Sequence, residues 1–123
     1  PQDALLAIKH GIKGLIISNH GGRVLDTCIS PLLALQIIKK VVPDDFPLIY
    51  DGGIRRGSDV FKALALGGSA VCIGRPYIYG LATAGALGVA HVLKILKEEF
   101  EITMALMGTA TLKDINKEYI SHK

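Results

Sequence analysis

The sequence predicts an α/β fold built from parallel strand–helix units. Three short, almost wholly apolar runs, at 14–18, 48–50 and 69–73, each lead into a glycine-rich loop. Helical patterns separate these runs, so strands and helices alternate along the chain. Such apolar runs are typical of parallel strands buried on both faces, and the alternation is typical of βα units. A unit length of about thirty residues or less fits either a (β/α)₈ barrel or a doubly wound sheet.

Four helical segments are predicted around these strands. Gly11 and Gly67 are placed to end two of them, because glycine is common just after a helix. Ser30 and Pro31 are suited to begin another, as N-cap and first helical residue. We expect the helices at 2–10, 31–42 and 58–66, and in a long region after residue 74. Three strands cannot close a barrel, which needs about eight strands and about 250 residues, so residues 1–123 are expected to form one incomplete domain.

The composition argues against several kinds of protein. The net charge is only +3, and Lys and Arg are spread along the chain, whereas a nucleic-acid-binding surface concentrates them. Cys28 and Cys72 form no CxxC motif and are expected to be small hydrophobic residues in a reduced, intracellular protein. No spacing of His, Cys or Asp indicates a metal site. The apolar stretches are interrupted before about 18 residues, so no membrane span is expected.

The two ends of the sequence carry weak signals. The chain begins at Pro1 and not at Met, which suggests a fragment, a processed product or a partial chain. The last three residues, Ser121-His122-Lys123, begin like a peroxisomal tail. The final Lys does not fit the Ser-Lys-Leu type, so this signal has little weight.

The loop after the first predicted strand reads Ser18-Asn19-His20-Gly21-Gly22-Arg23. A histidine can move a proton near neutral pH, and an arginine can bind a carboxylate in a bidentate pair. A base beside a carboxylate-binding group suits an α-hydroxy acid as substrate. Spacing alone favours a surface histidine in a flexible loop, because loops commonly carry polar residues. The loops after parallel strands share one rim, however, and this places the loop beside the next two.

Those next two loops read Asp51-Gly52-Gly53-Ile54-Arg55-Arg56-Gly57 and Gly74-Arg75. Glycines let backbone N–H groups approach a ligand, and Arg is suited to phosphate. In barrels, the loops after the last two strands are the usual phosphate site. Each loop alone could equally contain turn glycines and solvated arginines. The pair in matching positions favours a phosphate-bearing cofactor.

Four blocks of the sequence, in matching order and spacing, resemble one family. They are SNHGGR, DGGIRRGSDVFKALALG, GRPYIYGLATAG and ILKEEFEITMALMG. Over residues 2–116 the chain is similar to the FMN-dependent α-hydroxy-acid dehydrogenases, which include glycolate oxidase, hydroxy-acid oxidases and the lactate dehydrogenase of flavocytochromes. The resemblance implies the C-terminal part of a TIM (β/α)₈ barrel, about strands six to eight. It also implies FMN-dependent oxidation of an L-2-hydroxy acid to the 2-oxo acid.

The resemblance implies a role for each matching residue. His20 corresponds to the base that accepts a proton from the substrate, and Arg23 to the arginine that pairs with its carboxylate. Ser18 corresponds to a residue near the flavin and Asp51 to a ribityl contact. Residues around the FMN phosphate are implied at Gly52, Gly53, Arg55, Gly74 and Arg75. Ile54 is also implied to bind the cofactor, whereas Arg56 is expected to lie farther out or on the surface.

Parts of the family's active site have no counterpart here. A flavin-contacting Lys, a second carboxylate-binding Arg, an Asp that orients the base and a substrate-contacting Tyr belong to earlier strands. We therefore expect residues 1–123 alone to bind flavin weakly or not at all. The implied partners are a 2-hydroxy acid and oxygen, a quinone or a cytochrome as electron acceptor, and the implied assembly is a homo-oligomer, a tetramer, in the cytoplasm or peroxisome. The alternatives are an IMP-dehydrogenase-like or type 2 isopentenyl-diphosphate-isomerase-like enzyme, or an inactive barrel fragment; SNHGGR argues against the first two.

Overall fold

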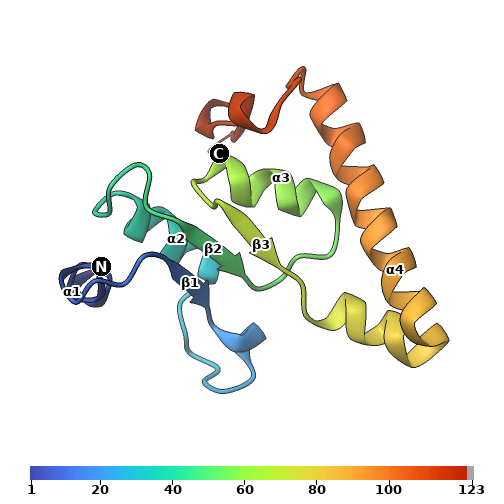
Figure 1. The fold of residues 1–123 in the computed structure, drawn as a ribbon, viewed down its shortest axis with the longest axis horizontal. Helices are drawn as coiled ribbons and strands as arrows, with labels where there is room; N and C mark the ends of the chain where they lie inside the picture. Colours follow the sequence, from blue (N-terminus) through green and yellow to red (C-terminus); the bar gives the residue numbers. More distant parts are fainter. Residues whose placement is uncertain (122–123) are drawn as a thin grey trace.

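A computed structural model describes residues 1–121, so His122 and Lys123, with the end of the Ser121-His122-Lys123 tail, lie outside the described part. Three parallel strands form one sheet in the order β1-β2-β3 (Figure 1). They are β1 (Leu15–Ser18), β2 (Leu48–Asp51) and β3 (Ala70–Cys72). All three predicted strands are therefore present, in parallel pairing, and their carboxyl ends lie at one edge of the sheet.

Four α-helices connect and follow the strands. They are α1 (Gln2–Lys9), α2 (Pro31–Lys39), α3 (Gly57–Ala65) and α4 (Arg75–Leu106), and short 3₁₀ helices occupy His20–Gly22, Leu112–Asp114 and Lys117–Tyr119. Ser30 is the N-cap of α2 as predicted, although its side chain makes no capping hydrogen bond. The regular part of α2 ends at Lys39, three residues before the expected Val42. A turn continues the chain there, since the Val42 N–H donates to the Ile38 carbonyl.

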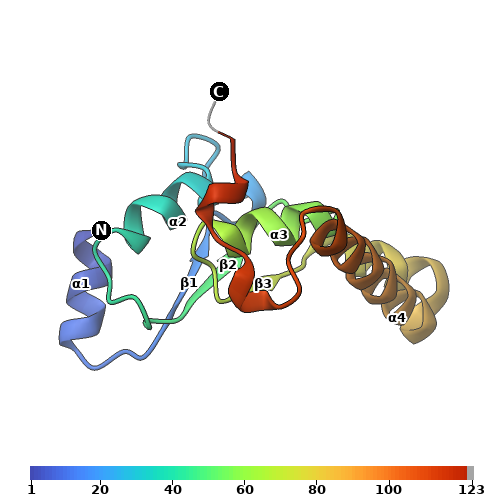
Figure 2. The same ribbon diagram turned by 90° about the horizontal axis from the view of Figure 1, so that it is seen from above.

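One face of the sheet is covered by α2 and α3, whereas α1 and α4 lie at opposite ends of the molecule (Figure 2). Leu35 of α2 and Leu48 of β2 are fully buried at the centre of the core. On the other face, Ile16 is 61% exposed. The expectation that the strands are buried on both faces therefore holds for one face only, because no element of the described chain covers the second.

Helix α4 is bent sharply. Ala84 and Gly85 have non-helical backbone angles, and Gly85 has a φ of 57°, which favours glycine. The two arms meet at Gly80 and Gly88, where a Cβ on either residue would overlap the backbone of the other. The first arm therefore starts at the carboxyl end of β3 while the second arm packs against α3 (Figure 1).

By length and composition, α4 is one helix that could cross a membrane, with a mean hydropathy of 1.4 over its most apolar window. This differs from the sequence-based expectation, because glycines interrupt that stretch without adding charge. The bend at Ala84 and Gly85 divides the helix into two shorter arms. The second arm carries charged residues at 94, 97, 98, 99 and 101. Length and composition alone therefore overstate how well this bent helix would suit a bilayer.

The C-terminal segment returns to α3. Phe61 of α3 packs edge to face against Tyr119, with ring centroids 5.8 Å apart, and Ile115 is buried in the same cluster. Asp114 holds the preceding turn, since its Oδ2 accepts hydrogen bonds from the backbone N–H of Thr111 at 2.6 Å and from its hydroxyl at 2.9 Å. These contacts fix the helix that carries the second glycine-rich loop.

Candidate functional site

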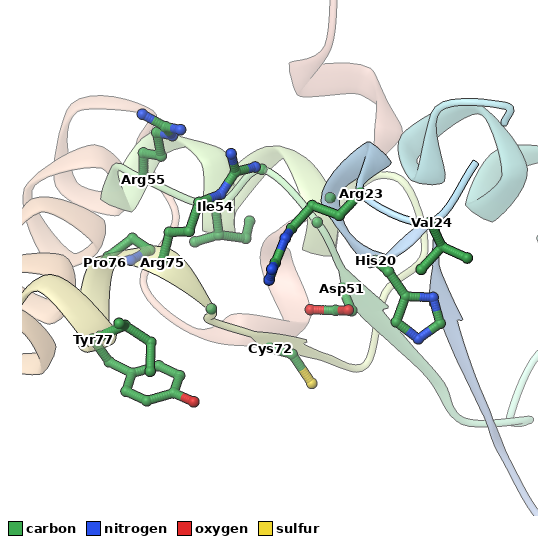
Figure 3. A pocket seen from close by; sticks show the side chains of 15 residues that line it. His20, Arg23, Val24, Asp51, Ile54, Arg55, Cys72, Arg75, Pro76 and Tyr77 are labelled. Carbon is green, nitrogen blue, oxygen red and sulfur yellow. The ribbon is translucent and has the colours of Figure 1, made fainter. Parts of the chain in front are cut away.

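A cavity of about 620 Å³ lies at the carboxyl ends of the three strands (Figure 3). It is lined by the loop after β1, the loop between β2 and α3, the end of β3 and the first turn of α4. Every residue predicted for the site except Ser18 contributes to this lining: His20, Arg23, Asp51, Gly52, Gly53, Ile54, Arg55, Gly74 and Arg75. The fold thus brings together three sequence-distant loops, as the parallel arrangement predicts.

The cavity favours an anionic ligand. Its lining contains the three guanidinium groups of Arg23, Arg55 and Arg75 but a single carboxylate, that of Asp51. Arg23 extends toward the space between Asp51 and Arg75 (Figure 3). Guanidinium groups retain their charge throughout the ordinary pH range and present several donors to phosphate or carboxylate oxygens.

Local hydrogen bonds hold the His20 loop in shape. The Asn19 side-chain oxygen accepts from the Gly21 N–H at 3.0 Å, and the Ser18 hydroxyl accepts from the His20 N–H at 2.9 Å. His20 itself has a φ of 53°. This left-handed conformation is uncommon outside glycine, and the two hydrogen bonds on either side stabilise it. The imidazole and the Arg23 side chain consequently face the same cavity.

Ser18 lies just behind the lining and connects two strands. Its hydroxyl donates to Oδ2 of Asp51 at 2.6 Å while accepting from the His20 N–H. A short bond to a carboxylate is charge-assisted and stronger than one between neutral groups. Ser18 therefore couples the position of Asp51 on β2 to that of His20 after β1, an arrangement that sequence analysis did not anticipate.

The N-terminus of α3 is already occupied by side chains of this chain. The N–H groups of Arg55 and Arg56 both donate to Oδ2 of Asp59, and the Gly57 N–H donates to Oε2 of Glu99 at 2.9 Å. The first-turn donors of a helix are the groups that would otherwise attract an anion. This end of α3 is thus capped by side chains of the same chain. From the loop before it, Gly53 and the Arg55 side chain face the cavity and could contact a ligand.

The N-terminus of α4 is different. Its N-cap is Gly74, no side chain caps it, and Pro76 lies in its first turn. Arg75 stands in the same turn and reaches across to the His20 loop, since a Cβ on Gly21 would lie 3.1 Å from its Nη2. A helix N-terminus with an arginine beside it is suited to an anion such as phosphate. Of the two helix ends at the cavity, this one has the free donors.

Several apolar residues also line the cavity and were missed from the sequence. Val24, Cys72, Pro76, Tyr77 and Ile78 form its less polar wall. Cys72 is the last residue of β3, so its place at the strand's carboxyl end was the signal available. Among residues 1–121, no group of three or more His, Cys, Asp or Glu side chains is arranged to hold a metal.

Comparison with known proteins identifies the family. A sequence model described as FMN-dependent dehydrogenase matches residues 1–122. The chain belongs to this family. It is 56% identical over 120 residues to a 2-hydroxyacid oxidase from Dictyostelium discoideum, covering 98% of this chain and 31% of the relative. It is 53% identical to a peroxisomal (S)-2-hydroxyacid oxidase from Arabidopsis thaliana, covering 97% of this chain and 33% of the relative. An L-lactate oxidase from Roseobacter sp. (strain GAI101) is 50% identical, with 98% and 33% covered.

Solved structures of related enzymes have the same fold over this segment. A soluble mutant of the membrane-associated (S)-mandelate dehydrogenase from Pseudomonas putida is 42% identical with a TM-score of 0.94, covering 99% of this chain and 34% of that one. A lactate oxidase from Pediococcus acidilactici is 50% identical with a TM-score of 0.90, covering 94% and 32%. The chain thus spans about a third of the length of the relatives it matches.

The residues present fit the phosphate end of FMN, the cofactor of this family. The uncapped start of α4 supplies backbone donors, and Arg75 and Arg55 supply positive charge on the same cavity. Gly53 has a φ of 75° and no heavy atom within 4 Å of a Cβ built on it, so its backbone is open to a ligand. A dianionic phosphate ester matches this set of groups, whereas a neutral ligand would leave it uncompensated.

Proposed function

We propose that the complete protein containing this chain oxidises an L-2-hydroxy acid to the 2-oxo acid with FMN as cofactor. The observation that carries the proposal is the shared cavity: His20 and Arg23 line it together with the phosphate-type groups Arg55 and Arg75. A proton acceptor and a carboxylate-binding group beside a flavin site are what this oxidation requires. The 2-hydroxyacid oxidases and lactate oxidase among the relatives support the same substrate class.

The three strands are proposed to be strands six to eight of a TIM barrel. The chain spans about a third of its structural relatives, and its sheet has one open face. Both features agree with a barrel segment whose remaining strands come from elsewhere in the complete protein. Because the open face leaves Ile16 61% exposed, we assign the activity to the complete protein and not to residues 1–123 alone.

Roles for the cofactor-binding residues follow from their positions. Gly74, Arg75, Gly53 and Arg55 are proposed to hold the FMN phosphate. Asp51, whose carboxylate already accepts a hydrogen bond from the Ser18 hydroxyl, is proposed to accept another from a ribityl hydroxyl. Gly52 and Ile54 complete this wall of the cavity.

The chemistry of the chain's own residues is binding and proton transfer. Bound FMN would supply the acceptor for the two electrons that leave the substrate and for one of the two protons lost with them. Arg23 is proposed to pair with the substrate carboxylate and so orient the hydroxyl-bearing carbon. His20 is proposed to accept the proton released as the hydroxyl carbon becomes a carbonyl. Ser18 holds the His20 backbone in place through its 2.9 Å hydrogen bond.

Anaerobic reduction of the full-length protein tests this function. The purified protein should be yellow, and its visible flavin absorption should bleach when L-lactate or glycolate is added without oxygen. D-lactate serves as the matched control, because the proposed site binds the L-isomer. A colourless protein after reconstitution with FMN, or no bleaching with any L-2-hydroxy acid, would contradict the proposal.

The partners beyond the substrate are proposed on the relatives alone. Oxygen is the first electron acceptor to test, by hydrogen peroxide release, because three of the matched relatives are named oxidases; a quinone or cytochrome would replace it in a dehydrogenase. A homo-oligomer, a tetramer, in the cytoplasm or the peroxisome is proposed, and one relative is named as peroxisomal.

A further inference from the structure

Glu99 lies on the second arm of α4, outside the cavity lining, and makes two contacts to the start of α3. Its Oε1 pairs with the Arg56 guanidinium at 2.7 Å, and its Oε2 accepts from the Gly57 N–H at 2.9 Å. The Glu99 side chain is 28% exposed. One carboxylate therefore binds a side chain and a backbone group of the same turn, and these two contacts lower the pKa of Glu99 below its usual value, the Gly57 hydrogen bond most strongly.

This turn is pressed closely against α4. A Cβ on Gly57 would overlap the backbone nitrogen of Phe100, so only glycine allows this approach. Asp59 fixes the other side of the turn, since its carboxylate accepts from the N–H groups of Arg55 and Arg56. The backbone that carries the Arg55 side chain is thus held between two carboxylates.

The contact also distinguishes two neighbouring cations. Arg56 is paired with Glu99, whereas Arg55 lines the cavity. An exposed ion pair alone is worth little. Here the same carboxylate also satisfies a helix-terminal N–H, so its effect on the position of the turn exceeds that of a simple surface pair.

We propose that Glu99 is a positioning residue for phosphate recognition: it anchors the Arg55-Arg56-Gly57 turn to α4 and so aims Arg55 at the cofactor phosphate. The same helix begins at Gly74 and Arg75, the other half of the phosphate site. Helix α4 therefore links both halves. The inference rests on the proposed FMN site and names a residue outside the cavity that determines its preference for phosphate.

The test compares FMN with riboflavin, which lacks the phosphate. Dissociation constants of both flavins are measured by fluorescence on the full-length apoprotein, for the wild type, Glu99→Ala and Glu99→Gln. Glu99→Ala should weaken FMN about tenfold or more, as loss of a hydrogen bond involving a charged group would, and leave riboflavin binding nearly unchanged. The amide oxygen of Glu99→Gln can still accept from the Gly57 N–H. The FMN affinity of this variant should therefore lie between those of the wild type and Glu99→Ala.

Glu98→Ala and Glu101→Ala are matched controls. Both residues lie on the same helix. Within residues 1–121, Glu98 pairs with Lys94 and Glu101 with Lys97 in exposed i,i+4 bridges, so both flavin affinities should stay at the wild-type values. If Glu99→Ala fails to fold, Glu99→Gln carries the comparison. The inference is overturned if the folded variant keeps its preference for FMN, or if both flavins weaken equally, which indicates a general structural role. A wild type that binds FMN no better than riboflavin would refute the proposed phosphate site itself.

Discussion

At the scale of single residues, the site depends on short connections between neighbouring loops. Ser18 bonds to both the His20 backbone and the Asp51 carboxylate, and the Asn19 side chain closes the turn at Gly21. These bonds hold His20 in a conformation that histidine seldom adopts. Its side chain can therefore be replaced without loss of the backbone contacts that shape the cavity.

Replacing His20 with Gln is expected to remove flavin reduction while keeping FMN. Loss of a general base lowers the rate about 10²–10⁴-fold, whereas the substitution leaves unchanged the protein groups near Arg75 that are proposed to bind the phosphate. Stopped-flow reduction by L-lactate and FMN titration of the same sample measure the two effects separately. His10→Gln is the control, since His10 is exposed at the end of α1. Flavin reduction in the His20 variant at the wild-type rate would show that His20 is not the proton acceptor.

The sequence was sufficient to predict that the charged residues of the three loops meet, but not which apolar residues complete the cavity or which hydrogen bonds join the loops. His20, Arg23, Asp51 and Arg75 follow from strand–loop alternation, because the ends of parallel strands share one rim. The Ser18–Asp51 bond joins residues 33 positions apart, and no local pattern encodes such a pair. The internal capping of α3 by Glu99 was missed for the same reason.

At the scale of elements, the bend in α4 lets one helix begin at the second phosphate loop and also pack against α3. The first arm starts at Arg75 and folds back on the second through the Gly80–Gly88 contact. The sequence predicts one long helical region here, because helical periodicity continues through the bend. Only the packed arms reveal why glycines recur in this stretch.

Gly88→Ala is expected to push the two arms of α4 apart. The new methyl group would overlap the Gly80 carbonyl, so unfolding in urea should require about 1–3 kcal/mol less free energy. FMN affinity should fall as well, because Arg75 moves with the first arm. Ala86→Ser, at an exposed position near the bend, is the control and should change neither quantity. If the Gly88→Ala protein is destabilised but its FMN affinity is unchanged, the bend does not contribute to the position of Arg75 in the site.

Acid is expected to weaken the 3₁₀ helix at Leu112–Asp114, which Thr111 and Asp114 cap. Hydrogen bonds from Thr111, backbone first, lower the pKa of Asp114. A carboxyl with a lower pKa when folded stabilises the protein above its unfolded pKa, and this stabilisation is lost as the pH falls through the folded pKa. Asp114→Asn should therefore lower the urea midpoint at pH 7 relative to the wild type, and the difference should shrink below about pH 4.

Asp45→Asn provides the comparison for this pH effect, because Asp45 is exposed in the loop before β2. Its urea midpoint should match the wild type at both pH values. A difference between Asp114→Asn and wild type that stays constant from neutral to acid pH would show that the Asp114 charge does not contribute.

At the scale of the whole molecule, the described chain is a partly open structure. Leu35 and Leu48 are fully buried between α2 and the sheet, yet Ile16 on the opposite face is exposed. The parallel order of the strands was predictable from their apolar runs. Which face lacks a cover was not, because both faces of β1 and β2 carry large apolar side chains, such as Ile17 on the covered face and Ile16 on the open one.

A crystal structure of the full-length protein with FMN would show whether the three loops together form the cofactor site. We expect the FMN phosphate at the N-terminus of α4, within hydrogen-bond distance of the Arg75 guanidinium, with the Arg55 side chain on the same phosphate and the flavin extending toward His20 and Arg23. Phosphate density at another helix end, or a flavin ring remote from His20, would contradict it.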